Sequence, residues 1–474
     1  MNLTQWIHDK IHFGYVILAA ATIGKVFSAP GQSPCIGVVI DKVALTIDIS
    51  STTISSIYLA ATITSAAVLP FTGILIKKWG VRISIGVIAF GLAFSCFLLS
   101  WSATNFHLYF SLFGLRFFGQ GLMMQTSITT LNLWWVRSRG MMMGVAGAIV
   151  SGFMLGIVPL IMMALMNGRG DWRYCYRILG LTTLAFMMPI GLALFRGKPE
   201  HIGLLPDGRR GESEVVLDES ESNEENFENN EEDDGNAAEG NVEPSKVLRE
   251  PVFWVFGCAD FITAATNTAF FFHLHRSMRD DMKFPDATVA AIYPIMAVVG
   301  ITGRLLAGHL VDRYGCRLIL IEGLVFMSFG FLFLPFTSSS TVFLAVIVLG
   351  LGGSQTHTTR SVVYATYFGR TSLPTIQPIA TSLTVAGSAF GPFPFGLVHD
   401  KTGSFKWAFI GAALLQFFVA LLVWVYGRRR SEGSDNSVQL GIYKTVSTED
   451  DSDSDSDSDS DGDEDEDEDE ESKR

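Results

Sequence analysis

Six ionisable side chains lie deep inside long apolar stretches of the sequence, where a charge is unfavourable unless it faces a polar cavity or a partner. They are Lys25, Arg116, Asp260, Arg304, His357 and Arg360. On membrane-insertion scales, a cationic side chain at the bilayer centre costs about 2.5 to 3.5 kcal/mol. We therefore expect these residues to do chemistry, and the excess of cations favours the binding of an anion.

Arg304 is the first candidate for a carboxylate ligand. A planar guanidinium binds a carboxylate through two parallel hydrogen bonds, which lysine cannot match. The alternative is that Arg304 pairs with a backbone carbonyl or with an acid near the inner surface. Lys25, directly after Gly24, and Arg360 are further candidates for substrate binding. Lys25 could instead extend its charge toward the outer surface.

Three residues are candidates for proton coupling. His357 lies one helical turn before Arg360, on the same face, and histidine titrates near physiological pH. It either carries a coupled proton or packs in the core. Asp260 either neutralises Arg304 or Arg360, or carries the proton itself. Arg116 either organises a helix interface or contributes to a proton path, with direct substrate contact as the third option.

Membrane helices must position these residues, because the sequence is 49% hydrophobic and only 17% charged. A helix needs about 20 apolar residues to cross a bilayer. Twelve such runs lie near residues 13–39, 53–76, 83–102, 106–135, 140–166, 173–195, 251–275, 286–311, 317–337, 341–368, 374–399 and 405–427. The predicted fold class is an all-α membrane protein with twelve transmembrane helices in two six-helix halves.

The runs divide the chain into five parts. We expect a cytoplasmic N-terminus (1–12), a six-helix half (13–200), an acidic disordered linker (201–249), a second six-helix half (250–428) and an acidic disordered tail (429–474). Lys and Arg are more frequent in the loops that would face the cytoplasm if the N-terminus does, which favours both termini inside and the plasma membrane as host. The net charge of -13 comes from the acidic linker and tail.

Other function classes find little support in the sequence. The acidic tail carries alternating serines that make an acidophilic kinase a candidate partner: Ser452, Ser454, Ser456, Ser458 and Ser460. The sequence contains no nucleophile elbow, no P-loop, no metal-ligand spacing and no basic patch with aromatic residues. We therefore expect no enzyme, no cofactor, no metal and no nucleic acid. The lipid bilayer is the expected surrounding.

Small and aromatic residues suggest how the helices pack. Glycines 140, 144, 147, 152 and 156 recur along the fifth predicted span and should let another helix approach closely. Four tryptophans fall near the ends of predicted spans, where they are expected to anchor the protein at the membrane interface: Trp101, Trp134, Trp135 and Trp254.

One ten-residue pattern occurs twice, after the second and the eighth predicted span. The first copy contains Gly73, Lys77, Gly80 and Arg82, and the second contains Gly308, Asp312, Arg313, Gly315 and Arg317. Together they resemble the G-x-L-x-D-R-x-G-x-R signature of the major facilitator superfamily. That resemblance covers residues 12–428 and implies two pseudo-symmetric halves with a substrate site between them near mid-membrane.

The first copy departs from the family pattern at Lys77, where the family has an aspartate. In the family this aspartate faces the N-terminal end of a helix in the opposite half, where the helix dipole favours an anion. Asp312 keeps this residue type in the second copy, whereas Lys77 would be repelled. We expect a conformational lock at the inner end that is weaker on the side of the first copy.

Further motifs resemble the monocarboxylate transporters and the oxalate:formate antiporters, notably Pro199, Glu200, Pro206 and Asp207 after the sixth span and Gly303 and Arg304 in the eighth. Where monocarboxylate transporters have an aspartate, this sequence has Gly300, so their proton step cannot be transferred. The resemblance implies a secondary transporter of a small organic anion, a monocarboxylate, by proton symport or anion exchange. Alternatives are another solute such as nitrate, or a sensor on the same fold that does not transport.

Overall fold

The computed structural model describes residues 13–169, 171–202, 204–208 and 244–427, and within these residues every regular element is helical. Most of the acidic linker and all of the acidic tail, with its serines, lie outside the described residues. Helices that are continuous over about 20 apolar residues satisfy all their backbone groups internally, which is what a lipid environment demands. The predicted all-α membrane fold is confirmed.

The first part of the described chain forms a series of helices from Phe13 to Leu194. They are α2 (Phe13–Phe27), η1 (Ala29–Gly31), α3 (Ser33–Ile47), α4 (Ser51–Val68), η2 (Leu69–Phe71), α5 (Thr72–Ser100), α6 (Asn105–Gly114), η3 (Leu115–Met123), α7 (Met124–Trp134), α8 (Arg139–Gly152), η4 (Phe153–Ile157), α9 (Val158–Arg169), α10 (Trp172–Thr182), η5 (Thr183–Met187) and α11 (Met188–Leu194). Two short turns follow, η6 (Pro199–Ile202) and η7 (Pro206–Gly208).

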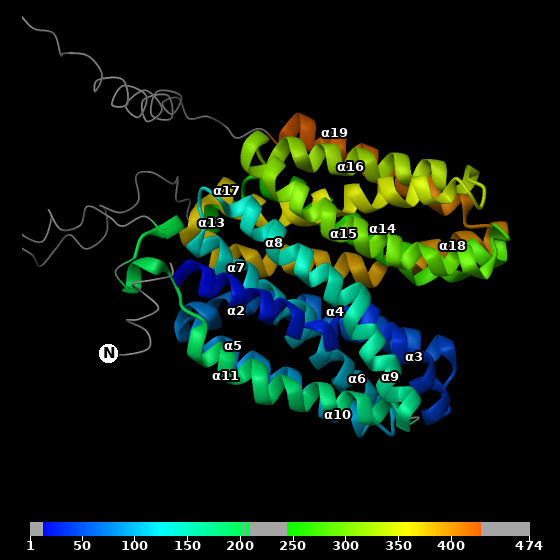
Figure 1. Cartoon of the computed structure of the whole chain (residues 1–474), viewed down its shortest axis with the longest axis horizontal. Helices are drawn as coiled ribbons and strands as arrows, with labels where there is room; N and C mark the ends of the chain where they lie inside the picture. The colour runs from blue at the N-terminus through cyan, green and yellow to red at the C-terminus, as the bar shows by residue number, and fades with distance from the viewer. Residues whose placement is uncertain (1–12, 170, 203, 209–243, 428–474) are drawn as a thin grey trace, which may run out of the picture. The chain divides into compact units, whose positions relative to one another are not determined.

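The second part begins with the short α13 (Pro244–Val247) and continues through longer helices. They are α14 (Pro251–His275), η9 (Arg276–Asp281), α15 (Asp286–Tyr314), α16 (Cys316–Phe333), η10 (Leu334–Phe336), α17 (Val342–Phe390), α18 (Pro392–Thr402) and α19 (Lys406–Tyr426). In Figure 1 the helices α14–α19 lie side by side. Helix α8 runs beside them, in contact with α15 and α17, at the border with the other helices that precede residue 200.

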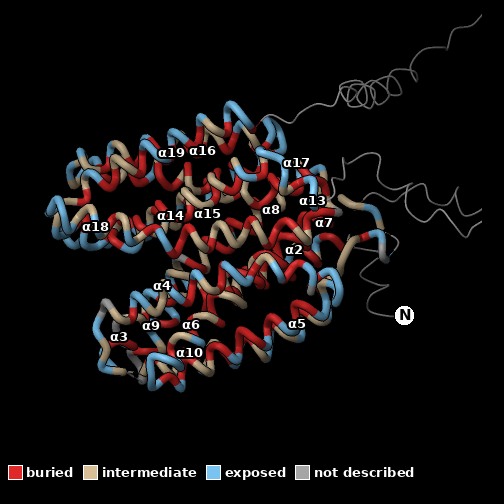
Figure 2. The backbone as a smooth tube through the Cα atoms, turned by 180° about the vertical axis from the view of Figure 1, so that it is seen from behind, coloured by how far each residue is buried: buried red, intermediate tan, exposed pale blue. Residues whose placement is uncertain are grey.

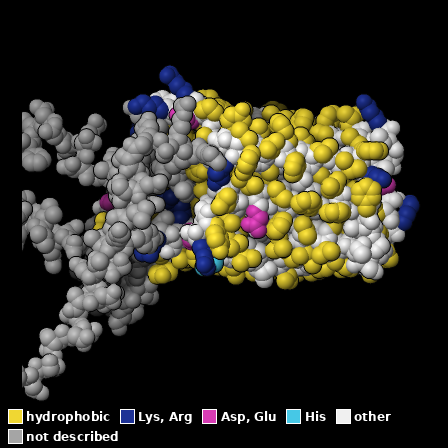
Figure 3. Space-filling view, turned by 90° about the horizontal axis from the view of Figure 1, so that it is seen from above, with side chains coloured by type: hydrophobic (Ala, Val, Ile, Leu, Met, Phe, Trp, Pro, Cys, Tyr) yellow, Lys and Arg dark blue, Asp and Glu magenta, His cyan; other side chains and the backbone are white. Residues whose placement is uncertain are grey.

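Nine helical segments of the described chain are long and apolar enough to span a membrane. The three predicted spans not among them are helical too: 106–135 falls on α6, η3 and α7, 140–166 on α8, η4 and α9, and 374–399 on the end of α17 and on α18. The interior of α7 is polar, with Gln125, Thr126, Thr130 and Asn132 buried. Exposed apolar side chains cover the flank of the molecule in Figure 3, with Lys and Arg mostly toward its two ends, as a bilayer requires.

The two copies of the ten-residue pattern form matching turns. Gly80 has φ +74° and Gly315 has φ +85°, backbone angles that favour glycine. After each turn, the arginine of the pattern reaches the end of the last helix of its series. Arg82 donates to the carbonyl of Leu192 in α11, and Arg317 donates to the carbonyls of Val423 and Trp424 in α19. The pattern therefore ties equivalent helix ends together in both parts of the chain.

The predicted close approach along the glycine series is found between α8 and α15. A Cβ atom added to Gly144 would lie 2.6 Å from the carbonyl oxygen of Arg304, and one added to Gly308 would lie 2.7 Å from the carbonyl oxygen of Gly140. Gly156, farther along in η4, has open space at this position. Gly140 and Gly144 thus bring α8 and α15 into backbone contact, which places Arg304 at this crossing.

The prediction of a place at the membrane interface is wrong for two of the four tryptophans. Trp101 and Trp254 are 65% and 49% exposed, as anchors should be, whereas Trp134 and Trp135 are 0% and 3% exposed. Trp134 donates a hydrogen bond to the carbonyl of Gly197 at 2.6 Å, so the chain after α11 covers it. In Figure 2 buried positions follow the sides on which helices face one another, and exposed positions follow the outer sides.

Candidate functional site

A cavity of about 100 Å³ lies among α14, α15 and α17, and four of the predicted site residues line it: Asp260, Arg304, His357 and Arg360. Asp260 comes from α14, Arg304 from α15, and His357 and Arg360 from one face of α17. The helices that carry these residues are neighbours in Figure 1. The structure therefore brings together charged residues that are up to 100 positions apart in the sequence.

A second cavity of about 90 Å³ shares three of these residues. Asp260, His357 and Arg360 line it too, together with Gln32 and Gln120 from the first part of the chain and with residues 377–385 of α17. A buried water needs roughly 10–15 Å³ of such space, so each cavity has room for several waters or a small solute. Asp260, His357 and Arg360 thus stand where the two cavities meet.

Arg304 is held from one side by α8. Its Nη1 donates a hydrogen bond of 3.0 Å to the carbonyl of Gly147, and its Nε is buried without a partner among the described residues. The predicted alternative, a backbone carbonyl as partner, is therefore present for one nitrogen. No carboxylate of the described chain forms an ion pair with Arg304, so the guanidinium keeps capacity for an anion.

Asp260 and Arg360 attract each other across the cavity without forming an ion pair among the described residues. Instead, the hydroxyl of Tyr364 donates a 2.8 Å hydrogen bond to Oδ2 of Asp260. Sequence reasoning missed Tyr364. Its position four residues after Arg360, on the same face of the helix, is the signal that could have found it.

Lys25 is only 3% exposed, and its ammonium nitrogen lies 3.6 Å from the sulfur of Met143. It does not extend to a surface, which removes the alternative that its charge leaves the protein interior. Its ammonium is within electrostatic range of Arg304 and Arg360 but lines neither cavity. The cavities themselves present two arginines, Arg304 and Arg360, against one carboxylate, Asp260.

This excess of positive charge favours an anion, because the attraction is stronger where the effective dielectric constant is lower than in bulk water. His357 adds a group that can accept a proton beside Asp260. Within the described residues, no group of His, Cys, Asp and Glu side chains could hold a metal ion. The chemistry available here is anion binding and proton transfer.

Arg116 does not join this cluster. It is fully buried in η3, where it donates hydrogen bonds to the carbonyl of Gly31 and to the hydroxyls of Ser33 and Ser388. The first two partners belong to the same part of the chain as Arg116, and Ser388 lies on α17. The predicted role at a helix interface agrees with this geometry.

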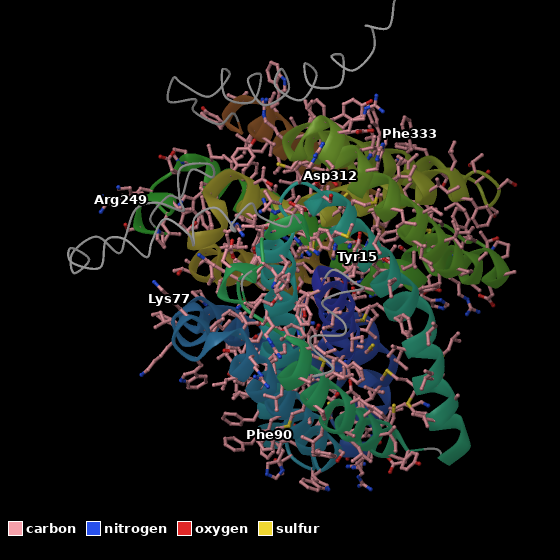
Figure 4. The ribbon with its side chains drawn as sticks, turned by 60° about the vertical axis from the view of Figure 1, so that its left-hand side comes forward. Tyr15, Lys77, Phe90, Arg249, Asp312 and Phe333 are labelled. Carbon is pink, nitrogen blue, oxygen red and sulfur yellow. The ribbon has the colours of Figure 1, made fainter. Side chains whose placement is uncertain are left out.

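The two copies of the repeated pattern differ in the contacts of the residues that we predicted to form a lock. The carboxylate of Asp312 accepts hydrogen bonds from the backbone N–H groups of Gly140 at 2.6 Å and Met141 at 2.7 Å, in the first turn of α8. Lys77 is exposed, and Figure 4 shows it at the periphery of the helices, apart from Asp312. Arg313 is exposed as well and lies over the ring of Tyr314. Gly73 touches the backbone of Pro374.

A segment that sequence reasoning treated only as a mark of kinship makes contacts at the same end. Glu200 in η6 forms an ion pair of 2.8 Å with Arg370 in α17. Asp207 accepts hydrogen bonds from the backbone N–H groups of residues 136, 137 and 138, just before α8. The chain after α11 therefore touches both the loop that leads to α8 and the middle of α17.

Fold and cavity define an integral, multi-pass membrane protein with a charged cavity among its helices. The chain belongs to the Major Facilitator Superfamily, whose family model matches residues 13–376 and 278–447. Members of this superfamily are membrane transporters of small solutes. No curated protein matches the sequence significantly.

Solved structures of this superfamily have the same fold. The human organic anion transporter MFSD10 (TETRAN) is 14% identical, with a TM-score of 0.61 over 86% of this chain and 99% of that one. The proton:xylose symporter XylE is 12% identical, with a TM-score of 0.62 over 87% and 95% of the two chains. The fucose:proton symporter FucP of E. coli is 14% identical, with a TM-score of 0.59 over 87% and 99%.

Proposed function

We propose that this transporter carries a small organic anion, a monocarboxylate, by alternating access with proton symport or anion exchange. The observation that carries the proposal is the pair Arg304 and Arg360, which line one cavity without an ion-pair partner among the described residues. Arginine is suited to a carboxylate because its fork of donors matches the two oxygens. Lys25 adds a third positive charge within range.

The substrate class rests on this cavity and on the motif resemblance to the monocarboxylate and oxalate:formate branch. The similar solved structures include one transporter of organic anions and two sugar symporters, and at 12% to 14% identity they speak only for the fold. Their substrates therefore do not choose between classes. The excess of positive charge at the cavity supports an anion as substrate, because a neutral sugar would leave the buried Arg304 and Arg360 without compensation.

In the proposed cycle, a carboxylate binds between Arg304 and Arg360 and weakens the attraction of Arg360 for Asp260. Asp260 and His357 face both cavities, so either can take up a proton as the anion arrives. Arg116 serves the helix interface in this scheme. With anion exchange instead, Asp260 stays ionised and balances part of the positive charge while the cavity is empty.

The lock residues and the host membrane complete the proposal. We assign the end of the bundle that carries Asp312 to the cytoplasm, with both chain termini on that side, and the plasma membrane as host. The helices before residue 200 and after residue 250 act as the two halves that rock about the cavity. The acidic tail is a candidate kinase substrate.

Uptake into proteoliposomes tests the proposal. Labelled pyruvate, lactate, formate, oxalate and nitrate are offered with and without a pH gradient to wild type, Arg304→Ala and Arg304→Lys. We expect one carboxylate to accumulate, Arg304→Ala to reduce uptake at least about 100-fold, and Arg304→Lys to restore little of it, because a single ammonium replaces the two-pronged contact. A loss of 100-fold corresponds to about 2.7 kcal/mol.

Arg249→Ala is the matched control, since Arg249 is exposed and points away from the helices in Figure 4. It should transport like wild type. Normal uptake by Arg304→Ala would overturn the assignment of the site, and accumulation of none of the carboxylates would overturn the substrate class. Carboxylate binding without any uptake would favour the alternative that the protein is a sensor on the same fold.

A further inference from the structure

Arg116 is a fully buried guanidinium for which the described chain supplies no carboxylate. Its Nη1 donates to the carbonyl of Gly31 and to the hydroxyl of Ser33, both at 3.1 Å, and its Nη2 donates to the hydroxyl of Ser388 at 3.0 Å. Nε is buried and has no partner among the described residues. A buried cation that is compensated only by neutral groups is costly, so this arrangement calls for an explanation.

The two edges of the guanidinium are used differently. Nη1 is fixed by Gly31 and Ser33, which come from the same part of the chain, and the ring of Tyr58 lies 5.2 Å from the guanidinium carbon. The other edge consists of Nε and Nη2, the side that can bind a carboxylate through two parallel hydrogen bonds. Only the hydroxyl of Ser388, on α17, occupies that edge.

Ser388 also connects Arg116 to the central cavities. Gln120, one turn after Arg116, donates to the same hydroxyl at 3.4 Å, and Gln120 lines the cavity that Asp260 and Arg360 share. Arg116 and Gln120 both lie in the π-helical segment η3, a backbone form that is frequent at functional sites. Arg116 lines neither cavity itself, but it shares the hydroxyl of Ser388 with Gln120, which does line one.

We propose that Arg116 is a second anion-binding station, which receives a carboxylate on its Nε and Nη2 edge when α17 moves away and Ser388 leaves. The proposal rests on the proposed transport of a small organic anion. Ser388 is the neutral placeholder that keeps Nη2 satisfied until α17 moves. Gly31 and Ser33 hold the guanidinium in place through the change, and the anion then passes Gln120 to reach Arg360 and Arg304.

Charge-selective labelling of a cysteine at Ser388 tests the station without a known substrate. The full-length Ser388→Cys variant in proteoliposomes is treated, from the face opposite Asp312, with an anionic thiol reagent (sulfonatoethyl methanethiosulfonate) and a cationic one (trimethylammonioethyl methanethiosulfonate). We expect the anionic reagent to react about tenfold faster, since a local cation raises the concentration of anions. Adding Arg116→Gln should abolish this preference, and Arg116→Lys should keep most of it.

Two controls define the signal. Wild type carries only the five native cysteines and gives the background rate. Ser382→Cys is the matched position on α17, because the Ser382 hydroxyl bonds to the carbonyl of Ala66 and not to Arg116. Its charge preference should not respond to Arg116→Gln.

Equal rates for both reagents at Ser388→Cys would overturn the proposal, as would a preference that survives Arg116→Gln. An unreactive Ser388→Cys would overturn it as well, because the hydroxyl would then never leave Arg116. Failure of the proposed function looks different: no carboxylate accumulates in the uptake assay, while the preference at Ser388→Cys persists and depends on Arg116.

Discussion

The hydroxyl of Tyr364 donates a hydrogen bond of 2.8 Å to the carboxylate of Asp260, and both side chains are buried between α14 and α17. This bond orients the only carboxylate that lines the two cavities among the described residues. It also leaves Arg360 outside ion-pair distance of that carboxylate in the described chain. The position of Asp260 relative to the arginines therefore depends on a neutral phenol.

Asp260→Asn should separate coupling from transport. An amide cannot take up a proton, so a pH gradient should no longer stimulate uptake, while exchange of anions across the membrane should continue. Tyr364→Phe should keep the coupling but reduce the uptake rate several-fold, because the carboxylate is no longer oriented. The ratio of uptake with and without a pH gradient measures both effects.

Tyr367→Phe is the control for the phenol, since the Tyr367 hydroxyl donates to the carbonyl of Gly427. Interhelical hydrogen bonds in membranes contribute about 0.6 kcal/mol on average, so both tyrosine variants should fold. A pH-gradient effect that is unchanged in Asp260→Asn would assign the proton to another group.

Lys77→Asp should add the lock contact that the first copy of the repeated pattern lacks. Asp312 accepts two backbone N–H groups at the start of α8, whereas Lys77 is exposed. An aspartate there would face the backbone near Pro374, which Gly73 already touches. We expect the cytoplasmic end to close more often, and a cysteine near the opposite face to become about two to five times more reactive, which corresponds to roughly 0.4 to 1 kcal/mol.

Asp312→Asn is the opposite change and should lower the same reactivity, because an amide is a weaker acceptor for the two N–H groups. The two variants, Lys77→Asp and Asp312→Asn, should change the cysteine reactivity in opposite directions. If Lys77→Asp leaves cysteine reactivity on the face opposite Asp312 unchanged, the interpretation of the first copy as a weakened lock fails.

Asp207→Asn should loosen the segment that follows α11. The Asp207 carboxylate accepts hydrogen bonds from the N–H groups of residues 136, 137 and 138, and the residue has φ +58°. Asparagine tolerates this backbone angle, so the substitution removes charge without adding strain. We expect a loss of about 1 kcal/mol in stability, seen as a lower melting temperature in detergent.

Asp48→Asn is the matched control for Asp207→Asn. Asp48 also has a positive φ, +59°, and is exposed at the end of α3. Its replacement should leave the free energy of unfolding within about 0.5 kcal/mol of wild type, and the melting temperature essentially unchanged. Equal melting temperatures for Asp207→Asn and wild type would show that the segment after α11 does not stabilise the loop before α8.

Much of this architecture could be predicted from the sequence because lipid imposes simple constraints on a chain. The apolar runs predict helices, and the repetition of one pattern predicts that two equivalent places in the chain adopt the same local structure, as the turns at Gly80 and Gly315 do. The clustering of Asp260, His357 and Arg360 could be predicted in part, because His357 and Arg360 share a helix face.

The spacing from Arg360 places Tyr364 on the same helix face, but its bond to Asp260 could not be predicted, because the two residues lie far apart in the sequence. The hydrogen bonds that Asp207 accepts from residues 136–138 and the burial of Trp134 under the chain at Gly197 likewise depend on how helices and loops pack. Apolar composition identifies a membrane segment but does not tell which end is covered by protein. For this reason Trp134 and Trp135 were expected at the membrane interface and are buried instead.

Gly144→Ala should impair transport by separating the two helices that hold Arg304. A Cβ atom at this position would lie 2.6 Å from the carbonyl oxygen of Arg304 and 3.0 Å from the Cα atom of Gly308, so the backbone must move apart. Overpacking of this kind costs about 1 to 3 kcal/mol. We expect KM for the transported anion to rise about tenfold, because the bond between Arg304 and the carbonyl of Gly147 lengthens with the crossing.

Gly156→Ala is the matched substitution on the same predicted span, and nothing lies within 4 Å of its added Cβ atom. It should leave KM and the melting temperature close to those of wild type. A comparison of the two variants separates a steric effect at the crossing from a general effect of replacing glycine in a membrane helix. If both variants raise KM equally, the contact between α8 and α15 does not position Arg304. A rise confined to Gly144→Ala shows that the glycine series sets the position of the arginine.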